Sequence, residues 1–191
     1  HLAAALGFDR EGDTVRASRS LELAHEFDHW NPAPLLVDAR RKRRNGNTTA
    51  SLEAYGHALR LATFTKGPGR DAIALEIARQ FSDPDQIARA PPADDIEVWP
   101  HLLSTLLASG RSDLVTEVGT RLAAGAGTDD ARRVALTWVA QASADRGQWD
   151  KARVTALPLI EGGGPAAAHA VLVRADLHAG NPHSALTRAE V

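Results

Sequence analysis

The sequence predicts an all-α protein, built as an α-solenoid of about six antiparallel helix pairs. Three observations lead to this prediction. Alanine and leucine carry most of the 43% apolar content, and aromatic residues make up only 5%, which favours helices over sheets. Glycines recur in similar surroundings about every 34 residues, as in helical repeat proteins. Each of these glycines stands between two runs with helical periodicity.

The glycines set the boundaries of the predicted pairs. The turn glycines are Gly12, Gly46, Gly110, Gly147 and Gly180. Their spacings are 34, 64, 37 and 33 residues, and the long spacing leaves room for one more turn, predicted near Ser82 in QFSDPDQIARA. A glycine in this position ends one helix and lets the chain reverse into the next. The predicted pairs are 1–31, 32–66, 67–95, 96–130, 131–164 and 165–191, and the region 63–100 is expected to be the least regular.

Helix ends and buried stripes follow in chain order. In the first pair, a second helix is predicted over 16–30, ended by Asn31-Pro32, and its inward stripe is Ala17, Leu21, Ala24 and Phe27. Further along, Ser112 and Thr128 are predicted helix caps, and Asp129 and Asp130 place negative charge on a first turn. Asn181-Pro182 is a cap followed by proline at the first helical position. The tryptophans Trp30, Trp99, Trp138 and Trp149 are predicted to pack between pairs.

The second and fifth pairs carry a family resemblance. The stretch GNTTASLEAYGHALRL has turn Gly46, small Ser51, aromatic Tyr55 and then Ala58, and RGQWDKARVTALPLI follows the same pattern from Gly147. This pattern resembles the second half of the tetratricopeptide repeat (TPR). The resemblance covers most of the chain and is weakest between Thr63 and Pro100. It implies a TPR-like right-handed superhelix, with a concave groove lined by the first helix of each pair.

A binding groove is the functional expectation that follows from the resemblance. Alignment of the turns places the following residues on the groove side: Arg40, Arg43, Arg44, Arg79, Gln141, Asp145, Arg174 and His178. Most of these side chains are cationic or form hydrogen bonds, and arginine binds carboxylates through two parallel hydrogen bonds. We therefore expect a non-catalytic protein-protein interaction or scaffold domain without a cofactor, whose partner is a protein or peptide, acidic in character, or a neighbouring domain.

One motif suggests an enzyme instead. His25, Glu26 and His29 form H-E-x-x-H, in which two histidines one helical turn apart bind zinc and the glutamate activates a water molecule. The surrounding residues resemble the metal helix of peptide deformylase. That family takes a third ligand from a cysteine, and this chain has no cysteine. We therefore expect no metal site, and a zinc-dependent hydrolase is the alternative.

The densest charge cluster is the run Arg40-Arg41-Lys42-Arg43-Arg44. Such a run can contact phosphates, but it can equally be a solvated helix C-terminus, where cations suit the helix dipole. Residues 1–70 carry 11 basic and 8 acidic side chains, whereas the whole chain has a net charge of −2. The run has no interleaved aromatic residues, so no nucleic-acid partner is expected.

Composition leaves the cellular setting open. No apolar run approaches the roughly 18 residues of a membrane span, so no span is expected in this segment. The alanine- and arginine-rich composition suggests a bacterium, in its cytoplasm or periplasm. The stretch DHWNPAPLL resembles repeat domains of bacterial cell-envelope proteins, including O-antigen-ligase-like polymerases. The chain begins at His1 and stops at Val191 within a helical pattern, so a fragment of a longer protein is expected. A regulatory TPR arm of a transcription factor is a second alternative.

Overall fold

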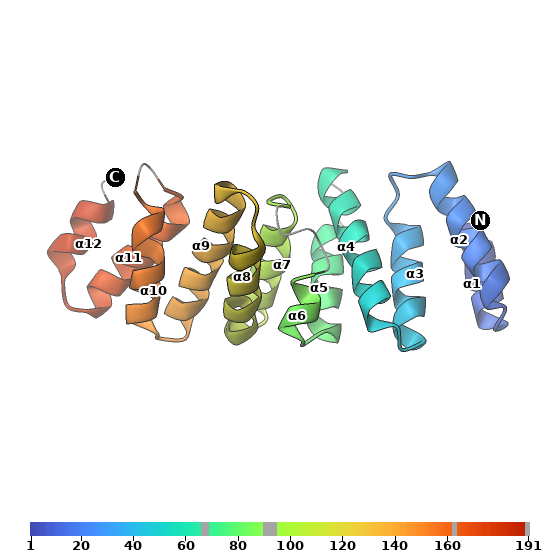
Figure 1. Ribbon diagram of the computed structural model, residues 1–191, viewed down its shortest axis with the longest axis horizontal. Coiled ribbons are helices and arrows are strands. Elements are labelled where there is room, and N and C mark those ends of the chain that lie inside the picture. Colours follow the sequence, from blue (N-terminus) through green and yellow to red (C-terminus); the bar gives the residue numbers. More distant parts are fainter. Residues whose placement is uncertain (66–68, 90–94, 162–163, 190–191) are drawn as a thin grey trace. The chain divides into compact units, whose positions relative to one another are not determined.

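The protein folds into helices. The computed structural model describes residues 1–65, 69–89, 95–161 and 164–189, and no strand occurs among them. Figure 1 shows the helices, which are α1 (Leu2–Arg10), α2 (Thr14–Phe27), α3 (Ala33–Arg44), α4 (Thr48–Phe64), α5 (Arg70–Gln80), α6 (Pro84–Ile87), α7 (Trp99–Ala108), α8 (Ser112–Gly125), α9 (Asp129–Asp145), α10 (Trp149–Ala156), α11 (Ala166–His178) and α12 (Pro182–Ala189). A short 3-10 helix, Leu157–Leu159, extends α10. The all-α prediction is confirmed for the described residues.

The helices form two compact units. Unit 1 contains α1 to α5, and unit 2 contains α6 to α12. Within unit 1 each helix packs against the next along the chain. In unit 2, from α7 onward, consecutive helices also pack together, and α9 makes additional contacts with α7 and α11. The predicted pair 67–95 is divided, because α5 belongs to unit 1 and the four-residue α6 belongs to unit 2.

Five turns share one backbone geometry. All five predicted turn glycines have a positive φ, between 69° and 78°. At Gly46, the glycine N–H donates to the Arg43 carbonyl at 3.0 Å and the next N–H, of Asn47, donates to the Lys42 carbonyl at 2.9 Å. The same two hydrogen bonds recur at the other four glycines. This is the Schellman ending, which satisfies carbonyls that a helix end leaves open and favours glycine at the left-handed position. The five turn positions are confirmed.

The predicted turn near Ser82 has no turn glycine and relies on a side-chain cap instead. Helix α5 ends at Gln80, and the Asp83 side chain caps α6 by accepting from the Asp85 N–H at 2.9 Å. Thr128 caps α9 in the same way, as predicted, by accepting from the Ala131 N–H at 3.2 Å. The prediction for Ser112 was wrong, because Ser112 is the first helical residue of α8 and its side chain does not cap.

A small or apolar residue lies buried five positions after each turn glycine. These residues are Ala17, Ser51, Val115, Ala152 and Ala185, and each is at most 3% exposed. The buried Ser51 hydroxyl is satisfied, because it donates a hydrogen bond to the Ala39 carbonyl at 2.7 Å. The second helix of each pair therefore approaches the first at a position that accepts little side-chain volume.

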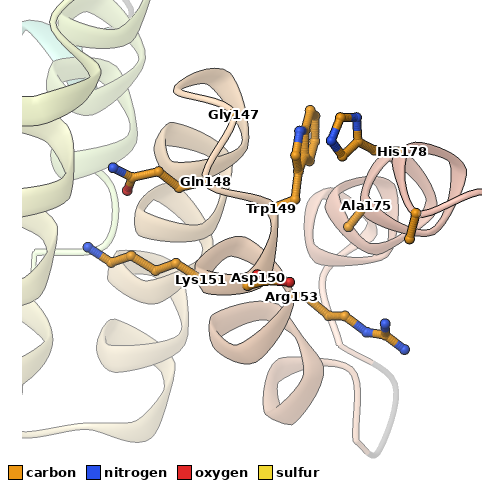
Figure 2. A pocket seen from close by; sticks show the side chains of 9 residues that line it. Gly147, Gln148, Trp149, Asp150, Lys151, Arg153, Ala175 and His178 are labelled. Atoms are coloured by element: carbon orange, nitrogen blue, oxygen red, sulfur yellow. The ribbon is translucent and has the colours of Figure 1, made fainter.

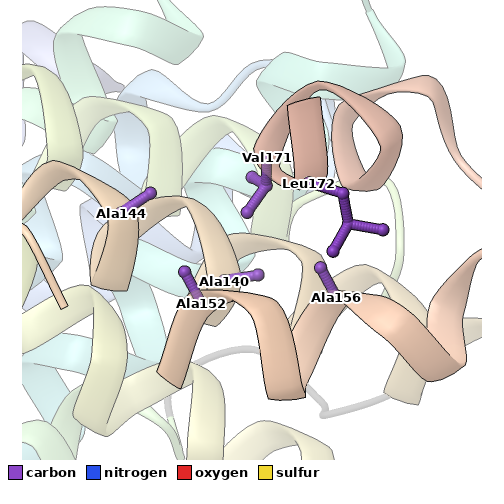
Figure 3. Packing of buried hydrophobic residues seen from close by; sticks show 6 residues of the cluster. All are labelled: Ala140, Ala144, Ala152, Ala156, Val171 and Leu172. Atoms are coloured by element: carbon purple, nitrogen blue, oxygen red, sulfur yellow. The ribbon is translucent and has the colours of Figure 1, made fainter. Parts of the chain in front are cut away.

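Unit 2 is packed closely around α9. Its core includes Ala140 and Ala144 of α9, Ala152 and Ala156 of α10, and Val171 and Leu172 of α11, as Figure 3 shows. On the other side of α9, Gly119 of α8 faces Val139, and a Cβ added at Gly119 would lie 2.7 Å from the Val139 Cγ2 atom. Small residues thus let α8, α10 and α11 approach α9, which gives α9 a fixed position.

Helix α2 differs from its prediction. It ends at Phe27 rather than near residue 30, because Asp28 adopts an extended backbone with φ −141° and ψ 72°. Ala17, Leu21 and Ala24 are buried as expected, but Phe27 is 75% exposed and stacks only on His1, with ring centroids 5.0 Å apart. The inward position for Phe27 was therefore wrong. Trp30 is also not a packing residue, being 59% exposed.

Candidate functional site

The arginines predicted for the groove in unit 1 already bind carboxylates of the chain. Arg40 of α3 donates twice to Glu76 of α5, from Nε to Oε1 at 2.8 Å and from Nη2 to Oε2 at 2.7 Å. Arg44 pairs with Asp9 of α1. Arg43 donates to the Gln80 carbonyl at 3.3 Å and lies over the Phe81 ring. These three side chains tie α3 to the helices on both sides.

The other two cations of the basic run share one carboxylate within α3. Arg41 Nη2 lies 3.1 Å from Asp38 Oδ1, and Lys42 Nζ lies 2.7 Å from Asp38 Oδ2. All five cations of the run therefore have a partner in the chain. A phosphate ligand would have to compete with these ion pairs and hydrogen bonds, so the run is a weaker nucleic-acid candidate in the fold than in the sequence.

Tyr55 of α4 completes the network around Glu76. Its hydroxyl donates to Glu76 Oε1 at 2.6 Å, and the Gln80 amide donates to the same oxygen at 3.1 Å. Burial of the phenol, followed by its hydrogen bond to Glu76, raises the pKa of Tyr55 to about 12. The hydrogen bond from Arg40 lowers the pKa of Glu76 below its ordinary value. A fully buried tyrosine with these partners connects three helices and is a structural group.

Arg79, the remaining predicted groove residue of unit 1, lies in the last turn of α5 and is exposed. It makes no hydrogen bond or ion pair with the described part of the chain. It is the predicted groove arginine whose guanidinium is available to a ligand.

Three predicted residues of unit 2 gather around Trp149. Asp145 of α9 and Arg174 of α11 form an ion pair at 3.3 Å. The Arg174 guanidinium lies 5.7 Å from the Trp149 ring centroid, and His178 stacks on the same ring at 4.8 Å. Figure 2 shows the indole and imidazole side by side. These contacts bring the three residues together, whereas their place on a concave groove and their binding role remain predictions.

A cavity of about 850 Å³ lies beside this stack. Its charged lining includes Asp150, Lys151 and Arg153. Figure 2 shows Lys151 and Arg153 pointing in different directions, so they do not converge on one ligand atom. Arg153 also faces the buried carboxylate of Asp176, at 3.8 Å. We therefore regard this cavity as a surface hollow and not as the candidate ligand-binding site.

A second cavity, of about 450 Å³, is lined mainly by one helix. Helix α9 supplies one continuous face to it, which consists of Asp130, Arg133, Val134, Thr137, Trp138 and Gln141. Ile96 and Pro100 line it at the start of α7, and Pro165 lines it at the start of α11. We call this cavity the α9 groove. Trp138 and Val134 are half-buried and Ile96 is 41% exposed, so apolar surface remains open to a ligand.

The polar groups of the α9 groove are largely unengaged. Neither Gln141 nor the indole of Trp138 makes a hydrogen bond with the described residues, and Asp130 forms no ion pair with them. Arg133 donates to the Glu161 carbonyl at 3.0 Å. The groove thus combines an aromatic surface with an amide, an indole N–H and a carboxylate, which can bind both the side chains and the backbone of a peptide.

Sequence analysis identified only Gln141 of this groove as a site residue. Trp138 was assigned to packing, and Ile96 and Asp130 received no binding role. One signal was present in the sequence, because Asp130, Val134, Trp138 and Gln141 recur at helical spacing. That stripe lies beside the buried stripe of α9, which contains Ala131, Ala135 and Val139.

The H-E-x-x-H motif lacks the geometry of a zinc helix. His25 lies within α2, whereas His29 lies past its end in a turn, so the two imidazoles are not one helical turn apart. The His25 Nδ1 atom is buried and has no hydrogen-bond partner among the described residues, and His29 packs against Trp30. Across the ranges that the structure describes, no group of three or more His, Cys, Asp or Glu side chains is placed to hold a metal ion.

Comparison with known proteins adds no functional assignment. No protein-family model, curated protein or solved structure matches the chain. A search for membrane-spanning segments found, within the described residues, no helix of sufficient length and hydrophobicity. The geometry of the two units therefore carries the functional argument.

Proposed function

We propose that this chain is a non-catalytic interaction domain, an α-solenoid of TPR-like helix pairs that binds a peptide segment in the α9 groove. The repeat assignment is supported by five identical glycine turns and by the small residue buried five positions after each of them. Such helix pairs bury their apolar faces by stacking, which leaves the outer face of the first helix for ligands. In α9, that face carries the groove.

The observation that carries the proposal is a partly exposed tryptophan in a largely apolar groove, beside an amide and a carboxylate that no described residue engages. Trp138 offers a large, rigid surface, and tryptophan is enriched among residues that dominate binding energy. From Asp130 to Gln141 the groove follows α9 for about 16 Å, at 1.5 Å per residue. That length accommodates about five residues of an extended peptide at roughly 3.3 Å each.

The close packing behind α9 makes the groove suitable for binding. Ala140 and Ala144 are buried against α10 and α11, and Gly119 brings α8 close on the other side. A helix held on several sides presents its outer side chains in a fixed arrangement, which lowers the entropic cost of binding. The amide, indole and carboxylate at the groove form hydrogen bonds and ion pairs with a ligand.

A displayed library of random peptides, selected on the purified domain, tests this proposal. We expect selected peptides to shift the backbone amide resonances of α7, α9 and the start of α11. Trp138→Ala should weaken their binding by about 30-fold, the effect of losing a central anchor of about 2 kcal/mol. Trp30→Ala is the control, because Trp30 is an exposed tryptophan that lies in unit 1, outside the α9 groove. Peptides that bind Trp138→Ala and the native protein equally well would refute the groove.

A further inference from the structure

The charge of the α9 groove indicates which peptides it accepts. This inference rests on the proposed function and specifies its ligand. The sequence-based expectation of an acidic partner depended on arginines, yet Arg40, Arg44 and Arg174 each pair with a carboxylate of the chain. In those places an acidic peptide would have to displace an existing partner. In the α9 groove, by contrast, a carboxylate of the chain has no ion-pair partner among the described residues.

Asp130 is the groove's unpaired acid. Its side chain is exposed in the first turn of α9, it lines the cavity, and it forms no ion pair with the described residues. Arg133 also lines the groove and keeps its positive charge, but its guanidinium is oriented by a hydrogen bond to the Glu161 carbonyl. Unit 2 as a whole carries nine Lys and Arg against 14 Asp and Glu, a net charge of −5. The net charge of unit 2 therefore favours cations, and Asp130 is the carboxylate of the groove that can receive one.

We propose that the α9 groove binds a non-acidic peptide with an apolar or aromatic anchor on Trp138 and a Lys or Arg that reaches Asp130. Asp130 and Trp138 are eight positions apart, which corresponds to about 12 Å along the helix. An extended peptide covers that distance in about four residues. The ligand is thus a short segment in which the cation stands about four residues from the anchor. Gln141, with one amide donor pair and one acceptor, engages the peptide backbone beyond the anchor.

Fluorescein-labelled synthetic peptides of about 13 residues test this inference. Each has a Leu-Phe-Leu anchor at its centre in a Gly/Ser background, with Lys, Ser or Glu at about four residues on either side, so that peptide direction does not matter. At about 50 mM salt we expect the Lys peptide to bind about tenfold more tightly than the Glu peptide, with the Ser peptide between them. The difference should shrink at about 500 mM salt, because the groove is open to solvent.

Substitutions separate the groove charge from the field of the whole unit. Asp130→Asn should reduce the Lys-over-Glu preference to less than about twofold while leaving the Ser peptide almost unaffected. Asp113→Asn is the matched control, because Asp113 is an exposed acid in the first turn of α8 and does not line the α9 groove. It should leave the preference unchanged. Asn at residue 130 keeps side-chain size and removes only charge, so folding is preserved.

The outcomes distinguish this inference from the proposed function. Peptides that bind at Trp138 with equal or greater affinity when they carry Glu would overturn the ligand class and leave the groove in place. Equal effects of Asp130→Asn and Asp113→Asn would also overturn it, because the preference would then come from the net charge of unit 2. If no peptide binds, or if Trp138→Ala changes nothing, the proposed function itself fails.

Discussion

Helices α3 and α9 end in the same glycine turn but present different outer faces. Six residues before the turn glycine, α3 carries Arg40 and α9 carries Gln141. In unit 1 the arginine reaches across to Glu76 of α5 and closes the face with an ion pair. In unit 2 the amide has no partner in the described residues and lines an open groove. The same position before the turn thus holds two helices together in unit 1 and lines a surface groove in unit 2.

The difference comes from long side chains rather than from the backbone. The helix pairs use the same turn hydrogen bonds and bury small or apolar residues at the same position. What varies is whether an outer side chain is long enough to find a charge on another helix. Arg40 and Arg44 are long enough, and their partners lie 36 and 35 residues away in sequence. Substitution of one outer side chain can therefore change whether a helix face is held by an ion pair or stays open to a ligand.

The largest expected contrast is between the two aromatic residues, Tyr55 and Trp138. Tyr55→Ala should lower the free energy of unfolding of unit 1 by about 3–5 kcal/mol, because it removes a fully buried ring and leaves a cavity. Trp138→Ala should cost less, about 1–2 kcal/mol, because the indole is only partly buried at the edge of a groove. Amide hydrogen exchange in α4 and α9 measures each unit separately. Similar losses in both variants would mean that Trp138 is a core residue.

The next effect is a pH dependence confined to unit 1. The pKa of Tyr55 is raised to about 12, so the folded state holds its proton after the unfolded chain has lost it near pH 10. The stabilisation is complete below pH 10 and is lost as pH rises from 10 to 12, by about 1–3 kcal/mol. Unfolding measured from pH 8 to 12 should show this slope in the native protein and not in Tyr55→Phe. Parallel curves for the two proteins would contradict it.

A reciprocal exchange tests the comparison of α3 with α9 directly. Arg40→Gln should destabilise unit 1 by about 1 kcal/mol, because it removes the bidentate hydrogen bonds to Glu76. Gln141→Arg should change stability by less than about 0.5 kcal/mol, because no partner is lost, but it should weaken binding of Lys-bearing peptides about fivefold by repulsion. Chemical denaturation and fluorescence polarisation give the two readouts. A stability loss from Gln141→Arg that equals that of Arg40→Gln would show that both faces are structural.

The smallest effect is expected at the end of α2. The double substitution of His25 and His29 by alanine should change stability by less than about 0.5 kcal/mol. His25 is partly buried, His29 is exposed, and neither imidazole forms an ion pair with the residues that the structure describes. Zinc added to the native protein should not raise its melting temperature. Stoichiometric zinc that survives dialysis and is lost in the double variant would restore the hydrolase alternative.

The sequence by itself determined the helices and their turns. Local signals carry this information, because a glycine with positive φ, a cap such as Thr128 and helical periodicity all act within a few residues. Ser112 shows the limit of such signals, since a cap prediction shifted by one residue fails.

Only the tertiary structure decided which side chains meet. It paired Arg40 with Glu76 and Arg44 with Asp9, and so engaged cations that the sequence had suggested were available to a ligand. It left Phe27 exposed at the end of α2 and Trp138 partly exposed in the lining of the α9 groove. The physical reason is that periodicity assigns a residue to a helix face, whereas burial and pairing depend on what a distant segment places opposite that face.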